Sequence, residues 1–422
     1  MIDKIKTKIY HLLRRSEKYT QTDMLYLTKG GFWLTAGYVI SFASSFFLAI
    51  AFANLLPKEI YGNYKYIIAA LAIISIPSLK DIAVALAQSV ARGFDANLKE
   101  IFFAKLKYGT LSSVLSLATA VYYFLNNNKV FALAFLIVSL IVPFYNAFNI
   151  FVGYLSGKKA FETITKYTGV SQIFVTACIL VTLYFTDNVI FILIVFLLST
   201  TLTRLICLLK TRKKFPPNNK KDDQSLKYGL HLSAMDVFQT IANESDKIFI
   251  FNYLGAPELA IYTIASAPVD QIRSLVLKIK ELAFPKLSQA NTEEIKKTLP
   301  KKILRASLLT IPIVILYIIL APWLFSLFFP EYQSSVLLTQ LLAIIVVIAP
   351  NALMSTALTA QRQIKSQYRM KIIGALGRLL IYFICVKYFG LLGIIIGRVL
   401  AEIYFAQLYA YFFHRMKSDT IT

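Results

Sequence analysis

Apolar residues gather in long runs along the chain, and short polar segments separate them. A helix needs about 20 mostly apolar residues to cross the roughly 30 Å hydrocarbon core of a bilayer. Runs of that size lie near 31–55, 62–86, 106–125, 130–155, 164–185, 188–209, 228–254, 259–283, 303–329, 334–360, 369–389 and 391–413. The pattern predicts an all-α polytopic membrane protein with about twelve transmembrane helices.

Basic residues are distributed unequally between the two sides of these runs. The loops of one side, with both chain ends, hold 34 lysines and arginines, whereas the other side holds only Lys58, Lys129 and Lys387. Cytoplasmic loops of membrane proteins carry the excess of positive charge. This predicts a multi-pass protein of the cytoplasmic (inner) membrane, with its N-terminus and C-terminus in the cytoplasm.

Residues 1–20 are basic but lack the apolar stretch of a secretory signal peptide. Ile2, Ile5 and Ile9 recur at helical spacing opposite lysines. This spacing favours a short amphipathic helix on the anionic inner leaflet, and a disordered basic tail is the alternative.

The sequence divides into two halves of six runs that resemble each other. A shift of 198 residues pairs Asn54 with Asn252 and Tyr64 with Tyr262. Because each half has an even number of crossings, the two are predicted to form parallel six-helix bundles around a central cavity. The predicted parts are a basic N-terminus (1–24), an N-terminal bundle (25–209), a cytoplasmic linker (210–227), a C-terminal bundle (228–413) and a cytoplasmic tail (414–422).

Composition excludes several other classes. The net charge of +23 would suggest nucleic-acid binding, but the basic residues lie in short loops between apolar runs, so none is expected. The three cysteines and three histidines form no metal-ligand or catalytic spacing. The segment Gly153–Lys159 is too short for an ATP-binding P-loop. We therefore expect no enzyme activity and no cofactor.

Eight basic residues remain within the runs once the 34 and three loop residues are set aside, and each costs about 2.5–3.5 kcal/mol at a helix centre. They are Lys65, Lys80, Lys247, Arg273, Lys278, Lys280, Arg378 and Arg398. Pairing with neighbouring acids, or extension of the side chain to the membrane surface, explains any one of them. Their concentration in the second, seventh, eighth, eleventh and twelfth runs favours a hydrated cavity.

The seventh run supports this interpretation. Asp236, Thr240, Asn243 and Lys247 are spaced to lie on one stripe of a helix. A stripe this polar in a membrane-spanning helix is expected to face water or a substrate. In the twelfth run, Gly393 and Gly397 form a small-xxx-small motif that predicts close helix contact.

Two segments carry a resemblance to a known family. They are Asn54–Tyr64, with the sequence NLLPKEIYGNY, and the corresponding part of the second half, Asp246–Ile250 followed by Leu254-Gly255 and Ala260–Tyr262. With the two halves and the polar seventh run, the chain resembles the Wzx-type polysaccharide flippases. These belong to the multidrug/oligosaccharidyl-lipid/polysaccharide exporter superfamily, which includes the MATE transporters. The second segment departs from the first, because Ala260 stands where glycine is usual.

The resemblance implies a MATE-like, V-shaped pair of bundles around a cationic lumen. Its substrate would be an undecaprenyl-pyrophosphate-linked oligosaccharide, moved from the inner to the outer leaflet, with membrane lipids, a polysaccharide polymerase and chain-length proteins as candidate partners. Arginine binds phosphate through two parallel hydrogen bonds. The candidate pyrophosphate ligands are therefore Arg273, Arg378 and Arg398, followed by Lys247 and Lys80. The candidate sugar contacts are Asn243 and Gln239, and the candidate sites for a coupling H⁺ or Na⁺ are Asp236 and Asp246.

Two other functions compete with this interpretation. A cation-coupled multidrug efflux transporter of the same superfamily should have an acidic or apolar cavity, whereas these spans carry slightly more base than acid. A glycan polymerase or ligase needs substrate-handling loops outside the membrane. The short loops such as Asn126–Lys129 leave no room for them.

Overall fold

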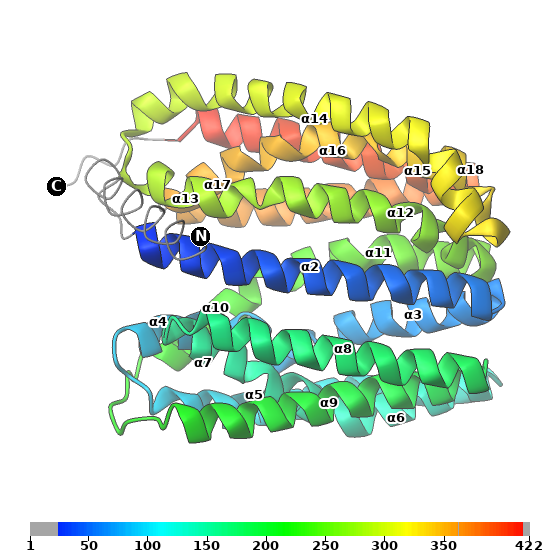
Figure 1. Cartoon of the computed structure of the whole chain (residues 1–422), viewed down its shortest axis with the longest axis horizontal. Helices are drawn as coiled ribbons and strands as arrows, with labels where there is room; N and C mark the ends of the chain where they lie inside the picture. Colours follow the sequence, from blue (N-terminus) through cyan, green and yellow to red (C-terminus); the bar gives the residue numbers. More distant parts are fainter. Residues whose placement is uncertain (1–23, 362, 417–422) are drawn as a thin grey trace, which may run out of the picture.

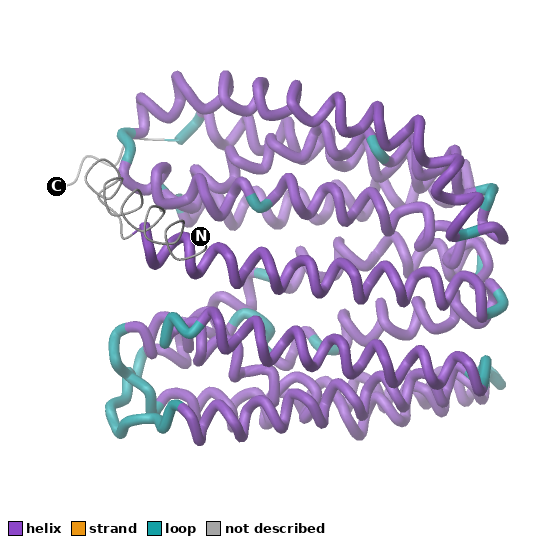
Figure 2. The backbone as a smooth tube through the Cα atoms, in the orientation of Figure 1, coloured by secondary structure: helices purple, strands orange, loops and turns teal. Residues whose placement is uncertain are grey.

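The computed structural model describes residues 24–361 and 363–416, in which helices are joined by short loops (Figure 2). The amphipathic segment predicted over residues 1–20 lies outside the described residues. The helices run roughly parallel to one long direction of the molecule, so that the connections gather at two ends (Figure 1).

The N-terminal bundle contains the first six crossings. Its helices are α2 (Met24–Leu55), α3 (Lys58–Ile74), α4 (Ile82–Ala91), α5 (Asn97–Leu125), α6 (Lys129–Ala147), α7 (Phe151–Gly157), α8 (Phe161–Phe185) and α9 (Val189–Lys214). The second crossing consists of α3 and α4, separated by the short helix η1 (Ile76–Ser78) and bent by 51°. Pro77 lies in η1, and proline breaks the hydrogen-bond ladder of a helix, which accounts for the bend. The fourth crossing likewise continues from α6 through η2 (Phe148–Ile150) into α7.

The C-terminal bundle contains the remaining crossings. Its helices are α10 (Ser225–Met235), α11 (Val237–Leu254), α12 (Ala256–Leu277), α13 (Ile279–Gln289), α14 (Thr292–Phe328), η3 (Pro330–Tyr332), α15 (Ser335–Leu342), α16 (Ile344–Ile348), η4 (Ala349–Asn351), α17 (Ala352–Ala360) and α18 (Ile364–His414). The connection between the bundles is shorter than the predicted linker, because α9 continues to Lys214 and α10 begins at Ser225.

Twelve crossings follow from these helices. Among the described residues, eight helices are long and apolar enough to span a membrane, and the bent pair of α3 and α4 makes a ninth. Helix α18 supplies two crossings, because Gly390 interrupts it with a positive φ of 60°. The pairs α10–α11 and α12–α13 form the remaining two crossings. They are not among the helices counted as apolar enough to span a membrane, because they carry charged residues.

The two halves of α18 form a tight antiparallel hairpin. A Cβ atom on Gly393 would lie 2.1 Å from the carbonyl oxygen of Cys385, and one on Gly397 would lie 3.0 Å from the Cβ of the same cysteine. Only glycine fits at Gly393, since 2.1 Å is well inside van der Waals contact. The predicted close contact of this motif is therefore confirmed, and its partner is the eleventh crossing.

The basic connections gather at one end of the molecule, and the shortest loops lie at the other, which we call the opposite end. The two bundles share one apolar core at this opposite end. Residues of both bundles form a single buried cluster there, including Tyr61 and Ile67 from α3 and Leu259 and Tyr262 from α12. A Cβ atom on Gly62 would lie 1.9 Å from the Ala256 carbonyl oxygen, so α3 and α12 touch through their backbones.

The other end carries the basic connections, and we call it the basic end. Here the apolar core divides into two clusters, one around α4, α5 and α7 and one around α14, α17 and the end of α18. The bundles therefore share one apolar core at the opposite end, whereas at the basic end each bundle has a core of its own. Figure 1 shows the helices of both bundles running between these two ends. This is the predicted arrangement of an all-α polytopic membrane protein in two bundles.

The seventh crossing is divided between the bundles. Helix α10 packs on α4 of the N-terminal bundle, where Leu226 and Leu230 contact its core and the Ser225 hydroxyl lies 3.5 Å from the Ala85 carbonyl oxygen. Helix α11 packs on α18 in the C-terminal bundle. The helix breaks at Asp236, so this residue lies where the two bundles meet.

Candidate functional site

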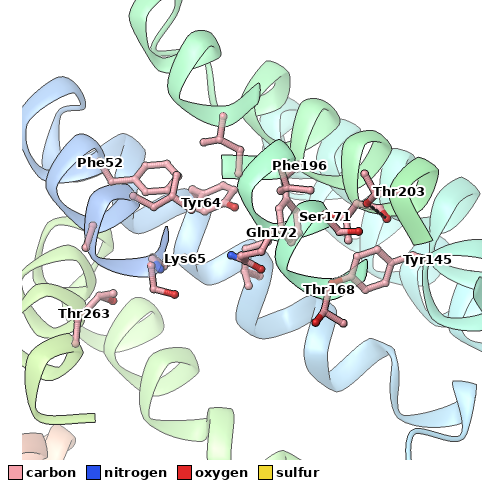
Figure 3. A pocket seen from close by; sticks show the side chains of 18 of the residues that line it. Phe52, Tyr64, Lys65, Tyr145, Thr168, Ser171, Gln172, Phe196, Thr203 and Thr263 are labelled. Carbon is pink, nitrogen blue, oxygen red and sulfur yellow. Dashed lines mark hydrogen bonds between the residues drawn. The ribbon is translucent and has the colours of Figure 1, made fainter. Parts of the chain in front are cut away.

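A cavity of about 560 Å³ lies between the N-terminal bundle and α12. Figure 3 shows Lys65 of α3, Gln172 of α8 and Thr263 of α12 around it, on separate elements. Its polar lining includes hydroxyl and amide groups, among them Thr168, Ser171, Gln172, Thr200, Thr203 and Gln271. The Oγ1 atoms of Thr200 and Thr263 are buried and have no hydrogen-bond partner among the described residues.

A second cavity of about 300 Å³ adjoins the first. The two share Ile68, Tyr145, Asn149 and Arg204 as lining residues. Three residues of the predicted polar stripe, Asp236, Thr240 and Asn243, line the second cavity, as does Lys80. The stripe thus faces a cavity between the bundles, and we call the two cavities together the lumen.

Two cations of the N-terminal bundle face the lumen without an acidic partner. The Arg204 guanidinium donates to the Tyr145 carbonyl oxygen at 2.7 Å and lies 4.1 Å from the centre of the Tyr145 ring. The Lys65 Nζ lies 5.3 Å from the centre of the Tyr61 ring. In the part of the chain that the structure describes, neither forms an ion pair. Lys80 at the second cavity also forms none within residues 24–361 and 363–416.

Arg204 is not among the residues predicted from the sequence, because it stands next to the basic loop that follows it. The apolar run of α9 continues through Leu205–Leu209. Arg204 therefore lies at least one full turn inside the crossing. This position within an apolar run is the sequence feature that could have identified it. Lys65 was found, but its side chain was equally well explained by extension toward the membrane surface. The structure places it beside the first cavity instead.

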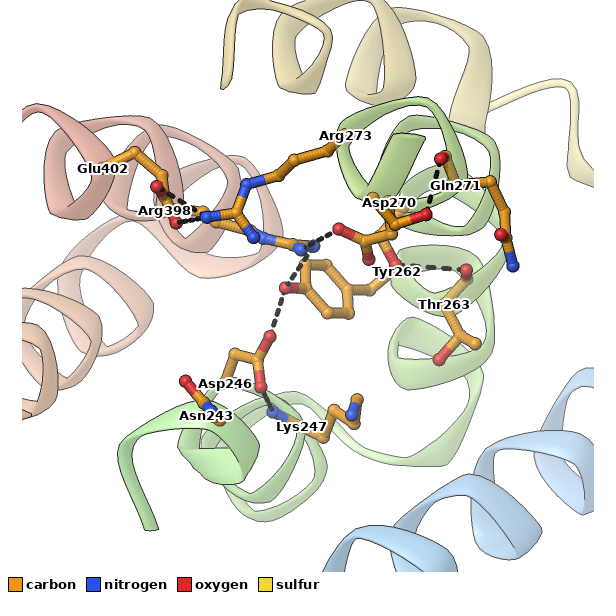
Figure 4. A network of polar contacts seen from close by, with 12 residues as sticks. Asn243, Asp246, Lys247, Tyr262, Thr263, Asp270, Gln271, Arg273, Arg398 and Glu402 are labelled. Atoms are coloured by element: carbon orange, nitrogen blue, oxygen red, sulfur yellow. Dashed lines mark hydrogen bonds and ion pairs between the residues drawn. The ribbon is translucent and has the colours of Figure 1, made fainter. Parts of the chain in front are cut away.

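The three predicted arginines come together within the C-terminal bundle and away from the lumen lining. Figure 4 shows Arg273 and Glu402 facing each other across α12 and α18. Arg273 Nη2 lies 2.8 Å from both carboxylate oxygens of Glu402. Arg378 Nη2 is 3.6 Å from the same carboxylate, and its Nη1 donates to Asn243 Oδ1 at 2.6 Å. The Arg378 side chain also lies over the Phe405 ring, 4.4 Å from its centre.

Arg398 extends this set of contacts toward α11. It pairs with Asp270 and donates to the Tyr262 hydroxyl at 3.2 Å, and that hydroxyl donates to Asp246 (Figure 4). Lys247 pairs with Glu244 at 2.6 Å.

We call these groups the C-terminal network. Its bases are Arg273, Arg378, Arg398 and Lys247, and its acids are Glu402, Asp270, Asp246 and Glu244. Four positive charges face four negative charges, so the network is neutral as a whole. These four bases of the C-terminal bundle are therefore balanced inside that bundle, and the lumen-lining cations without an ion pair among the described residues come from the N-terminal bundle.

The other predicted site residues, Asp236, Asp246 and Gln239, differ in their burial and hydrogen-bond partners. Asp236 accepts from Lys371 Nζ at 3.1 Å, and its carboxyl group lies near that of Asp81, which directly precedes α4. Asp246 is buried and accepts from Tyr262 and from the Lys247 backbone. The half-buried Gln239 donates to Asn243 at 2.9 Å. Among residues 24–361 and 363–416, no three His, Cys, Asp or Glu side chains are grouped as a metal site.

Comparisons with known proteins agree with this architecture. The sequence profile of a family described as polysaccharide biosynthesis proteins matches residues 27–291. A comparison with curated protein sequences finds no match.

Solved structures are similar over nearly the whole chain. The lipid II flippase MurJ in an inward closed conformation is 12% identical, with a TM-score of 0.67 over 91% of this chain and 87% of that one. A MATE transporter in complex with MaD5 is 14% identical, with a TM-score of 0.64 over 91% and 94%. A transporter of the MOP superfamily from Pyrococcus furiosus, whose binding pocket is described as having reverse polarity, is 15% identical, with a TM-score of 0.51 over 92% and 96%. At these identities the likeness concerns the fold, which is that of transporters and flippases rather than of an enzyme.

Proposed function

The chain belongs to the polysaccharide biosynthesis protein family, and we propose that it is a flippase for a lipid-linked oligosaccharide. The substrate would be an undecaprenyl-pyrophosphate-linked oligosaccharide, moved from the inner to the outer leaflet of the cytoplasmic membrane. The observation that carries the proposal is the set of cations that face the lumen without carboxylate partners, Lys65, Lys80 and Arg204.

The charge balance of the lumen favours an anionic substrate. Three acids also line it, and each is held by a base: Asp270 by Arg398, Asp236 by Lys371 and Glu244 by Lys247. Within residues 24–361 and 363–416 the lumen cations have no such partner, so a bound pyrophosphate would supply a balancing negative charge. Arg204 is the best placed of them for this, since a guanidinium forms two parallel hydrogen bonds to phosphate.

Sugar hydroxyls need donors and acceptors that are not already engaged. The hydroxyls of Thr200 on α9 and Thr263 on α12, which have no partner among the described residues, meet this requirement, and Gln172 adds an amide to the same cavity. We propose that these groups contact the first sugars, in addition to Asn243 and Gln239, which already bind each other.

The arginines of the C-terminal network take second place as phosphate ligands. For Arg273 to bind phosphate, the substrate would have to replace Glu402, and separating a buried ion pair costs about 3–5 kcal/mol. We propose that Arg273, Arg378 and Arg398 chiefly hold α11, α12 and α18 together and bind substrate only where it displaces their carboxylates.

The proposal also includes the orientation of the protein in the membrane and the residue that binds the ion driving transport. The basic end would face the cytoplasm, in keeping with the distribution of lysine and arginine. Asp236 would carry the coupling H⁺ or Na⁺, because it lies at the break of the seventh crossing and near Asp81 of the other bundle. A polysaccharide polymerase and chain-length proteins would use the product on the outer side.

A cation-coupled multidrug efflux transporter is the competing function. Cationic drugs need unpaired acids, whereas the lumen acids are paired. One experiment separates the two. In a deletion strain, loss of surface glycan with accumulation of lipid-linked repeat units on the inner face supports the flippase. Intact glycan with increased drug sensitivity contradicts it and supports efflux.

A further inference from the structure

A separate cavity, of about 270 Å³, lies at the basic end of the N-terminal bundle and shares no lining residue with the lumen. It is formed by the beginning of α5, the end of α9 and the connection between the bundles (Figure 1). Its chief lining residues are Leu98, Lys99, Phe102, Phe103, Leu208 and Arg212.

One wall of this cavity is apolar and continues onto the lipid-facing surface. Leu98 and Leu208 are buried at its base, and Phe102 stacks on Phe148 with ring centres 6.1 Å apart. Phe103 is 55% exposed. The wall thus offers a hydrocarbon chain a path from the surrounding bilayer into the cavity.

The rim carries two cations, Lys99 and Arg212, both exposed. Neither forms an ion pair among the described residues. They come from different helices and line the same small cavity, so they can reach a single anionic group.

The nearby acids are engaged elsewhere, so they do not neutralise this rim. Asp95 pairs with Lys158 at 2.6 Å. Glu100 and Asp223 both contact Lys221, at 3.3 and 3.0 Å, and the hydrogen bonds from Lys221 to Asp223 and Glu100 raise the pKa of that lysine. The rim therefore keeps two uncompensated positive charges.

The cavity lies at the depth of lipid head groups. About 20 residues cross the ~30 Å hydrocarbon core, which takes α9 from Val189 to near Leu209. Arg212 follows within one turn. Lys99 lies in the first turn of α5, so both cations sit just outside the hydrocarbon at the same end.

We propose that this cavity binds an anionic membrane phospholipid. Lys99 and Arg212 would contact its phosphate, and one acyl chain would lie on the apolar wall. Basic pockets between transmembrane helices bind anionic head groups in this way. Pro217–Asn219 of the connection also line the cavity, so a bound lipid would contact the segment that joins the bundles.

Native mass spectrometry of the purified full chain tests this proposal. Phosphatidylglycerol and phosphatidylcholine with the same acyl chains are added separately. We expect preferential binding of phosphatidylglycerol, and about fivefold weaker binding for each of Lys99→Gln and Arg212→Gln. Combining the two should weaken it about 25-fold.

The matched control is Lys210→Gln with Lys213→Gln, which removes two exposed charges from the same part of α9 but outside the cavity. If the control loses as much binding as the first pair, or if phosphatidylcholine binds equally well, the proposal is wrong. Phosphatidylglycerol with a photoreactive acyl chain should also label the peptide containing Phe102 and Phe103. Labelling spread evenly over the lipid-facing helices, and unchanged by the double variant, would contradict the site.

Discussion

The two bundles have the same number of crossings but use charge differently. In the C-terminal bundle, arginines face carboxylates at close range, as where Arg273 meets both oxygens of Glu402. In the N-terminal bundle, Arg204 rests on a tyrosine ring and a backbone carbonyl, and Lys65 lies near another tyrosine ring. The first arrangement satisfies its charges internally, whereas the second leaves charge available to a ligand. A count of basic residues alone would not separate these roles.

This contrast has a physical basis in the low dielectric of the membrane interior. A buried charge that loses its partner is costly, so a neutral network behaves as a structural unit. Cations beside a water-filled cavity keep much of their solvation and can exchange water for substrate. The comparison therefore predicts stability effects for one bundle and transport effects for the other.

The largest effect is expected from Glu402→Ala. This change leaves Arg273 without its bidentate partner and removes the carboxylate next to Arg378, so we expect a loss of about 3–5 kcal/mol of folding stability. Thermal unfolding in detergent, followed by fluorescence-detected size exclusion, measures it. The double variant Glu402→Ala with Arg273→Ala should recover part of the loss. A single variant as stable as the parent chain would mean that the network is not structural.

Arg204→Gln is expected to act on transport instead. Hydrogen bonds to charged groups contribute about 1.5–3 kcal/mol, so substrate flipping should fall about ten- to hundredfold. Thermal stability should change little, because Arg204 gives up no ion pair. Flipping of a labelled lipid-linked oligosaccharide in proteoliposomes measures the rate.

The control for Arg204→Gln is Arg305→Gln, an exposed arginine on α14 outside the lumen. It should retain the transport rate of the parent chain. Equal flipping rates for Arg204→Gln and Arg305→Gln would contradict the proposal that cations of the N-terminal bundle bind an anionic substrate in the lumen.

Asp236→Asn tests the place where the bundles meet. It pairs with Lys371 and lies near Asp81, which directly precedes α4, and its carboxylate is the candidate coupling group. We expect about a fivefold lower rate under an ion gradient and no change without a gradient. Proteoliposomes with imposed H⁺ or Na⁺ gradients measure both rates. A variant that still responds fully to both ions would show that Asp236 is not the coupling residue.

The smallest effect is expected from Glu162→Gln. Its pair with Lys166 in the N-terminal bundle is 2.7 Å long, yet both side chains are largely solvent-exposed. Exposed pairs contribute about 0.2–1 kcal/mol, well below the C-terminal network. The thermal unfolding assay used for Glu402→Ala gives a direct comparison. Similar losses from the two variants would mean that burial does not distinguish these ion pairs.

Much of the architecture could be predicted because it depends on local patterns. The length of an apolar run sets the number of crossings, and the small residues Gly393 and Gly397 indicated a close contact. The stripe through Asp236 and Asn243 indicated a cavity-facing side, since periodicity shows which residues share one side of a helix.

The roles of individual charges could not be predicted in the same way. Arg204 is close to a basic loop in the sequence, but the fold turns it toward Tyr145 and the lumen. Arg273 and Glu402 are 129 residues apart, so nothing local indicates that they pair. Whether a basic residue is neutralised depends on contacts between helices that are distant in the sequence.

The membrane-spanning class, the twelve crossings and the two halves of six can all be predicted from the pattern of apolar and basic residues. These follow from the cost of placing polar groups in hydrocarbon, which acts on each segment separately. Which cations line the lumen without an ion pair among the described residues, and which are balanced within a bundle, depends on how the helices pack. That outcome depends on distances of a few ångströms between helices, because the interaction of two charges is set by their separation and by the solvent around them.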